Sequence, residues 1–393
     1  MLSDIRNNAK SIFSQLGYPS TKDEMWKYTN VKKFNDYMSS DSQQLNYQPK
    51  DIPILDKSHN IIICNGQLIN KDIKISGVSI SNYEDILNLS VPAEKFLQIS
   101  NFNNNGVLAH NTSSFIDAVH IVINENEIID LPINIINISS NLENNIITFP
   151  RVYIHSKRNS KASIYIQNIS DSSRCAINSV MEFYCEDLSN LNIFELSDLK
   201  NQQIINSISF SQCDNSKINF LSTVFGCEMY RSNIEIGIDG EGCDNNFGVL
   251  MLGNTNNHID YHVNINHNRG NSFNNFNCKS LLKDTSIGIF NGKILVEKES
   301  AGTDSRLNNN NLLLSEKAEI QSNPQLEINC EDVKCAHGST TGNLDKEALF
   351  YLRSRGISLN KAKAILIHGF ISKLISSFNS DILSLDEKIK KWI

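Results

Sequence analysis

The feature that most constrains the fold is a long succession of short apolar segments, separated by Asn-rich turns, between about residues 105 and 340. Within each segment apolar and other residues alternate, as at Ile234, Ile236 and Ile238. Because successive side chains of a strand point to opposite faces, this two-residue period predicts strands that bury one face. We expect no helix in this region. Many short strands in one chain predict a sandwich, a barrel or a solenoid, and their spacing alone does not choose among them.

The residues before this region have a different pattern. Ser3 can cap an amphipathic helix that Gly17 would end, because glycine readily adopts the left-handed conformation that follows a helix. Residues 39–58 are polar, contain two prolines and predict a linker or irregular arm. The run IIICNGQLI, which starts at Ile61, combines an apolar stretch with an Asn-Gly turn and predicts a strand and hairpin.

Helical periodicity returns after Gly342. Asp345 can cap a helix that ends at Gly356, Ser358 can begin a longer one, and Asp381 can open a last one. The apolar stripe expected on the longer helix consists of Ala362, Ile365, Leu366, Phe370, Leu374, Ile375 and Phe378. The one expected on the last helix consists of Ile382, Leu385, Ile389 and Trp392.

A close pair of thiols stands where the strand pattern gives way to helices. Alternation from Leu326 onward predicts a strand that continues as far as Cys335, with Cys335 and His337 on one face and their Cα atoms ~6.5 to 7 Å apart. A thiolate and a neutral imidazole suit a soft metal such as iron or zinc, or a transient sulfur carrier. Cys330 would face the opposite side of the strand from Cys335 unless a bulge intervenes. A zinc site made of Cys330, Cys335 and His337 would also lack a fourth ligand. The alternative is a buried cysteine beside a solvated histidine, with no chemical role.

Composition excludes several classes of function. The formal net charge of -7 leaves no basic stripe, which argues against nucleic acid as a partner. The amino-terminal residues lack the apolar core of an export signal, and the most apolar helix, around 362–375, is interrupted by Lys363, His368 and Lys373, so we expect no membrane span. Nine cysteines at irregular spacing favour reduced thiols over a disulfide framework, and we expect a cytoplasmic protein.

Longer motifs carry a family resemblance. The run DVKCAHGSTTGNLDKEALFYLRSRGI at Asp332–Ile357, preceded by NNNLLLSEKAEIQSNPQLEI, resembles the C-terminal signature of the SufB/SufD family of iron-sulfur cluster assembly proteins. Within the family, the KC-x-HG version followed by FYLRSRG resembles the SufD branch. The segments EMWKYTNVKKF at Glu24–Phe34, IDYHVNINH at Ile259–His267 and GIFNGKILV at Gly288–Val296 are also similar to the family.

The resemblance implies a mainly β fold, a right-handed parallel β-helix or solenoid with helical N-terminal and C-terminal segments. We expect an N-terminal region over 1–100, a β-helix core over 101–342 and a helical domain over 343–393. The implied function is that of a non-catalytic scaffold subunit, which pairs with SufB as a heterodimer and docks the SufC ATPase. A nascent iron-sulfur cluster would be built transiently at the SufB/SufD interface, with no cofactor held tightly by this chain alone and with ATP hydrolysis left to SufC. The isolated chain is expected to be capable of forming a homodimer.

By carry-over from the family motif, His337 is the candidate iron ligand and Cys335 its neighbour. The helices from about Asn343 onward match the region that the family uses to dock SufC. The residues expected to take part in that docking are Phe350, Tyr351, Arg353, Arg355, Ile365 and Phe370.

Two other functions compete with this interpretation. One is a carbohydrate-active β-helix of the secreted type, which requires an export signal and a cluster of Asp, Lys and Arg on one sheet. The other is the zinc-binding structural protein described above.

The polar row Asp260, His262, Asn264 and Asn266, with His267 at its end, could suggest a metal or acid/base site, but we expect it to be the solvated or partner-facing outer surface of a solenoid.

Overall fold

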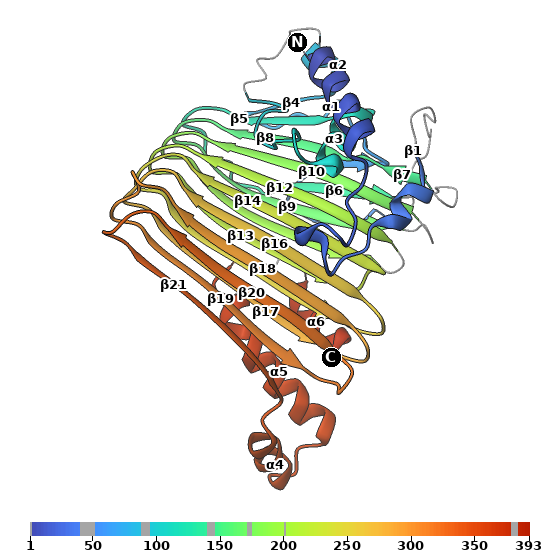
Figure 1. The fold of residues 1–393 in the computed structure, drawn as a ribbon, viewed down its shortest axis with the longest axis vertical. Helices are drawn as coiled ribbons and strands as arrows, with labels where there is room; N and C mark the ends of the chain where they lie inside the picture. The colour runs from blue at the N-terminus through green and yellow to red at the C-terminus, as the bar shows by residue number, and fades with distance from the viewer. Residues whose placement is uncertain are drawn as a thin grey trace.

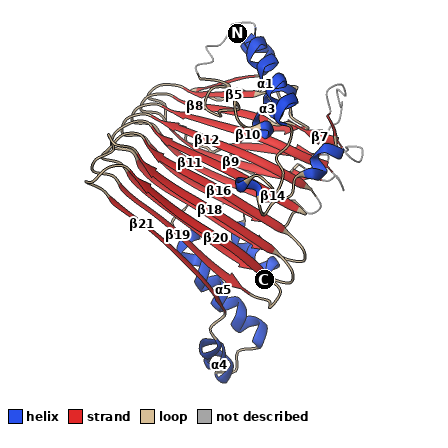
Figure 2. Cartoon of the chain, viewed as in Figure 1, coloured by secondary structure: helices blue, strands red, loops and turns tan. Residues whose placement is uncertain are grey.

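The computed structural model describes residues 2–39, 52–87, 95–139, 146–170, 175–199, 202–378 and 384–393. In these ranges the chain is a mainly β protein, a parallel β-solenoid with helices at its two ends (Figures 1 and 2). Most of the expected linker at 39–58, together with Asp381 and Ile382 of the expected last helix, lies outside the described residues.

Two sheets form the walls of the solenoid. Sheet A contains, in spatial order, β4 (Val78–Ser81), β5 (Val119–Ile123), β8 (Arg151–Ser156), β10 (Cys175–Cys185), β12 (Gln203–Gln212), β14 (Met229–Ile238), β16 (His258–His267), β18 (Ile287–Val296) and β20 (Glu319–Ile328), with β7 (Ile146–Thr148) beside β10 and β1 (Met38–Ser39) beside β7. Sheet B contains β3 (Gln67–Leu68), β2 (His59–Cys64), β6 (Ile133–Ser139), β9 (Lys161–Ser170), β11 (Asn190–Asp198), β13 (Lys217–Phe225), β15 (Asp244–Gly253), β17 (Phe273–Leu282), β19 (Asp304–Leu313) and β21 (Lys334–Asn343).

From β8 onward the chain passes from one sheet to the other at each strand, and each coil stacks on the previous one in parallel register. Met229 pairs with His258, and His258 pairs with Ile287, so one coil returns the chain to the same position in the sheet. Several corners place an asparagine at positive φ, including Asn159, Asn215 and Asn271. Asparagine tolerates this left-handed conformation better than most residues, which explains the Asn-rich turns of the sequence.

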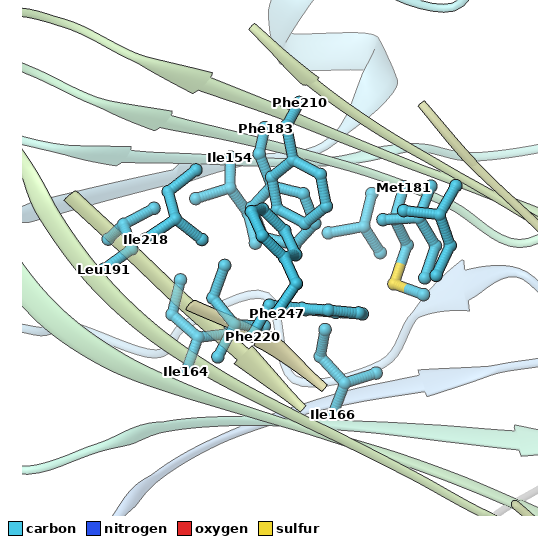
Figure 3. Close-up of a cluster of buried hydrophobic side chains, with 14 of the residues drawn as sticks. Ile154, Ile164, Ile166, Met181, Phe183, Leu191, Phe210, Ile218, Phe220 and Phe247 are labelled. Atoms are coloured by element: carbon cyan, nitrogen blue, oxygen red, sulfur yellow. The ribbon is translucent and has the colours of Figure 1, made fainter. Parts of the chain in front are cut away.

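The core is the lumen between the two sheets. Phe183 and Phe210 of sheet A stack with ring centroids 4.7 Å apart, and Phe210 meets Phe220 of sheet B edge-on at 5.3 Å (Figure 3). All three side chains are at most 2% exposed. Inward-facing residues thus bury a continuous apolar column coil by coil, as the alternating sequence pattern predicts.

The N-terminal edges of both sheets are closed. β3 folds back antiparallel on β2 through the expected Asn-Gly turn, in which Asn65 and Gly66 both have positive φ. β4 runs antiparallel to β5 at the corresponding edge of sheet A. These strands of two and four residues end the parallel stacking, and a short antiparallel edge is a poorer template for pairing with another chain.

The N-terminal helices lie against the outer face of sheet A. They are α1 (Leu2–Leu16), two 3₁₀ turns (Glu24–Trp26 and Lys32–Asp36), α2 (Tyr83–Leu87) and α3 (Gly106–Ser114).

Helix α3 corrects the expectation that no helix interrupts the region from about 105 to 340. Most of its residues are buried, so it has no polar face that would have revealed a helical period, and Asn105 caps it by accepting the N–H groups of Val107 and Leu108.

The C-terminal helices are α4 (Lys346–Ser354), α5 (Leu359–Ser376) and α6 (Leu385–Trp392). α5 and α6 pack on the outer face of sheet B, where Ile371 and Leu374 meet Leu250 and Leu281. The expected stripe on α5 is wrong at Ile365, which is 43% exposed, whereas Ile367 and Ile371 take part in the buried face. No helix in the described ranges has both the length and the apolar character needed to cross a membrane.

Candidate functional site

The C-terminal end of the solenoid differs from its N-terminal end because no strand covers β20 or β21 within the described residues. The expected continuous strand from Leu326 to Cys335 is wrong. β20 ends at Ile328, the chain turns from sheet A to sheet B, and β21 begins at Lys334. The backbone N–H of Asn329 still bonds to Val296 O on sheet A at 2.9 Å, whereas that of Lys334 bonds to Thr303 O on sheet B at 2.8 Å.

Cys335 and His337 lie on the lumen face of β21. They pair in register with Ser305 and Leu307 of β19, and Leu307 is a fully buried core residue. Cys335 is half-buried against the same core, whereas His337 is exposed because it lies over the last complete layer of the lumen. The two candidate side chains are therefore together at the open mouth of the solenoid, as the i and i+2 spacing predicts.

The Cys335 thiol is protonated in the uncovered chain. Burial raises its pKa, a nearby backbone N–H from Ser305 opposes this, and the Asp304 carboxylate raises the pKa further. A thiol of this kind becomes a metal ligand or nucleophile only when a cation or a partner favours the thiolate.

A polar layer that the sequence analysis did not identify lies beside the pair. Ser339, two residues after His337 on the same face, lies with its Oγ 2.8 Å from Ser322 Oγ on β20, so this contact bridges the two edge strands. Ser322 donates in turn to Asn309 Oδ1 at 2.7 Å. Asn309 is fully buried, and its Nδ2 has no hydrogen-bond partner in the described part of the chain. Asn309 and Asn311 alternate in the NNNN run of β19, and this period could have revealed an inward-facing polar layer.

The two open edges are not equivalent. In a parallel ladder, alternate residues direct their N–H groups to the same neighbour. Since Glu319 N donates to Ser286 O, the odd residues of β20 bond to β18 and the even ones face outward, and Pro324 occupies one of these outward positions. Lys334 N donates to Thr303 O, so the outward N–H groups of β21 belong to residues such as His337 and Thr341. Proline blunts the β20 edge, whereas β21 keeps its donors.

The zinc-binding alternative gains no support. Cys330 lies in the corner between β20 and β21 and packs against the core. Across the described ranges, no three His, Cys, Asp or Glu side chains are grouped so that they could hold a metal ion.

The residues expected to dock SufC lie on α4, at its C-terminal end and on α5. α4 extends past the last coil in Figure 1, and none of its side chains is buried. Phe350 is 74% exposed and Tyr351 58% exposed, and Arg353 and Arg355 are exposed as well. Phe370 differs from these because it is half-buried on α5, where the Lys279 ammonium lies 4.6 Å from its ring and donates to its carbonyl.

Half of the polar row on β16 departs from the expected solvated or partner-facing surface: Asp260 and His262 are buried, whereas Asn264 and Asn266 are partly exposed. Asp260 and His262 are 1% and 5% exposed because the N-terminal segment around Trp26 and Thr29 covers part of this face. Thr29 donates to Asp260, and the Arg231 guanidinium lies 4.2 Å from the Trp26 ring. His267 faces the lumen instead.

Comparison with known proteins places these features in a family context. Residues 137–370 match the family model described as "SUF system FeS cluster assembly, SufBD core domain", and residues 1–135 match "SufBD protein N-terminal region". Together the two matches extend over the N-terminal helices, the solenoid and most of α5.

Individual relatives agree with the family models. The chain is 34% identical to the iron-sulfur cluster assembly protein SufD of Escherichia coli over 160 residues, which are 41% of this chain and 38% of that protein. It is 23% identical to a SufBD family iron-sulfur cluster assembly protein of Synechocystis over 417 residues, covering 100% of this chain and 90% of the relative. The SufD protein of Plasmodium falciparum is 27% identical over 245 residues, 61% of this chain and 17% of that much longer protein.

Proposed function

The chain belongs to the SufB/SufD family of iron-sulfur cluster assembly proteins, and from this we propose that it is a scaffold subunit that pairs with SufB through the open end of its solenoid. A nascent cluster is the cargo of that interface. SufC docks on the C-terminal helices and supplies the ATPase activity, and the assembly works in the cytoplasm.

The observation that carries the proposal is the asymmetry of the two ends. Antiparallel strands close the N-terminal edges, whereas β20 and β21 leave the C-terminal end open with Cys335 and His337 on its lumen face. An uncovered strand edge with free donors is a template for pairing with another chain. A partner with the same fold could continue the stacking, and a second copy of this chain could do so in isolation.

Pairing would change the chemistry of the site. A covering subunit would shield His337 from water, and a neutral imidazole in such a site is a ligand for iron. Iron close to Cys335 would favour the thiolate, whose formation the free chain opposes. The Ser339, Ser322 and Asn309 layer would hold the two edge strands at a fixed separation while the cluster forms.

The C-terminal helices are well placed to link SufC to the solenoid. α4 presents Phe350 and Tyr351 to solvent, as expected of a surface that binds a partner. α5 and α6 are held on sheet B by Lys279, and by Lys283, whose ammonium donates to Trp392 O at 2.5 Å and lies 4.2 Å from the Trp392 ring. Motion of a docked ATPase would thus reach the outer face of sheet B.

Co-expression with SufB and SufC from the same host tests the proposal. We expect the three proteins to purify together in fixed stoichiometry, and the complex to gain visible absorption when iron and sulfide are added without oxygen. Purification of this chain without SufB and SufC, at protein concentrations where the complex should be stable, would refute it.

A further inference from the structure

Helix α4 and the first half of α5, residues 345–366, form a hairpin whose charge differs from that of the rest of the chain. The chain as a whole carries a formal net charge of -7, yet residues 348–380 contain no Asp or Glu. The cationic side chains of that stretch are Arg353, Arg355, Lys361, Lys363 and Lys373. The first four flank the turn between α4 and α5, and all four are exposed. We call these four residues the cationic tip.

Contacts inside the chain do not account for the cationic tip. None of its side chains forms an ion pair within the described ranges. The two arginines suit the C-terminal end of α4, where a positive charge complements the helix dipole, and the Arg355 guanidinium lies 5.3 Å from the Tyr351 ring. Lys361, in contrast, lies in the first turn of α5, where a positive charge opposes the dipole. A group of exposed like charges without counter-charges in the chain favours an acidic partner.

Helix α4 also lacks the burial that normally stabilises so short a helix. It has nine residues, none of which is buried, and it packs against α5. A helix of this length is marginal in water unless packing supports it. Phe350 and Tyr351 are 74% and 58% exposed, and as neighbours in sequence they point about 100° apart around the helix axis. Two aromatic side chains that diverge in this way fit the walls of a protein groove better than a flat lipid surface.

We propose that the α4–α5 hairpin enters a groove of SufC that is apolar inside and carries several carboxylates at its rim. This inference rests on the proposed docking of SufC and adds the chemistry that recognises the hairpin. Phe350 and Tyr351 occupy the inside of the groove, and the cationic tip lies against the rim. Charges at a rim act mainly on the association rate, whereas buried aromatic side chains mainly slow dissociation. The two groups of residues therefore have separable kinetic effects.

The first test measures association and dissociation rate constants of the full chain with SufC from the same host by stopped flow. We expect the association rate constant to fall about tenfold or more between about 50 and 500 mM salt, because salt screens the attraction. The double variant Lys361→Glu, Lys363→Glu should slow association about tenfold at low salt, remove most of the salt dependence and leave the dissociation rate nearly unchanged. Acidic residues are favourable at the start of α5, so its melting temperature should not fall.

The matched control is the double variant Lys10→Glu, Lys71→Glu, which makes the same change in net charge at exposed positions near the N-terminal end of the solenoid. It should associate nearly as the wild type does. A salt-independent association rate, or equal slowing by the two double variants, would overturn the proposal. No binding of SufC at all would refute the docking itself and the inference with it, whereas binding with neither rate effect would refute the acidic rim alone.

A second test locates the carboxylates. A carbodiimide condenses a lysine amine with a carboxylate that it contacts, and the water removed in forming the amide leaves as the urea of the reagent. We expect mass spectrometry to find Lys361 or Lys363 joined to Asp or Glu of SufC. Amides formed only with lysines outside the hairpin would overturn the proposal. So would phosphatidylglycerol vesicles that bind the wild type but not the Lys361→Glu, Lys363→Glu variant, if SufC association is the same for both, because the tip would then serve a membrane.

Discussion

Arg231 Nη1 lies 2.6 Å from Asp260 Oδ2, and both side chains are 1% exposed. Arg231 also donates to Met25 O at 3.0 Å, so the pair ties the N-terminal segment to β14 and β16. Burial by itself would raise the pKa of Asp260, but the Arg231 charge and the hydrogen bonds from His262 and Thr29 lower it to about 2. The ion pair is thus intact throughout the physiological pH range.

Removing the Arg231 guanidinium should destabilise the folded chain. We predict that Arg231→Met lowers the free energy of unfolding by about 3 to 5 kcal/mol, since it leaves the Asp260 charge buried without its partner. Urea denaturation measures the loss, and hydrogen exchange should show that residues 23–31 become less protected. Arg269→Met is the control, because the Arg269 pair with Glu299 is exposed and should contribute about 1 kcal/mol or less. Equal effects of the two changes would contradict this account.

His267 makes stability depend on pH. Burial lowers its pKa to about 4, whereas an unfolded histidine titrates near 6.5. The unfolded chain binds the proton more readily, so stability is lost as pH falls from about 6.5 towards 4. We predict that this residue accounts for about 1 kcal/mol of the stability lost between about pH 7.5 and 5.5. His267→Gln should reduce the pH dependence of urea unfolding by that amount, and an unchanged dependence would show that the group is not buried neutral.

The outward donors of β21 give a direct test of where the partner binds. Thr341→Pro removes an N–H that does not bond to β19, so the chain alone should lose about 1 kcal/mol or less of stability. We predict that it weakens association with SufB about tenfold or more, as measured by sedimentation or co-purification. Thr341→Ala keeps the N–H and serves as the control. Normal pairing by Thr341→Pro would place the interface elsewhere.

Alanine substitutions of Phe350 and Phe370 should have different effects, one on SufC binding and the other on the stability of the fold. Phe350 is 74% exposed on α4, so we predict that Phe350→Ala leaves the melting temperature unchanged and weakens SufC binding about tenfold. Phe370 packs against the cluster on sheet B, so Phe370→Ala should lower the melting temperature instead. Unchanged SufC affinity in Phe350→Ala would remove α4 from the docking surface.

The solenoid and its helical ends could be foreseen, because inward positions such as Ile234 and Ile236 keep a strict two-residue period. The hairpin turn at Asn65 and the helix cap at Asp345 also have local signatures. Helix α3 could not, because burial on nearly all sides leaves no amphipathic period. The corner after Ile328 is not predicted because Val333 and Cys335 resume an alternation soon after it, although they lie an odd number of residues from Ile328.

The site was foreseen in part. Spacing placed Cys335 and His337 on one face, but the Ser322 and Ser339 contact joins two strands in different sheets and has no local sequence signal. The burial of Asp260 and His262 depends on residues more than two hundred positions earlier in the chain, which no local pattern reports.

The measurement that tests the central claim most directly compares His337→Ala with wild type in the complex with SufB and SufC. His337 is exposed, so the variant should fold and assemble normally, and we predict that the complex then fails to gain cluster absorption after anaerobic iron and sulfide loading. His368→Ala, at an exposed histidine on α5, should behave as wild type. Full cluster absorption in His337→Ala would contradict its role at the site, and failure of that variant to fold would show that the residue is structural.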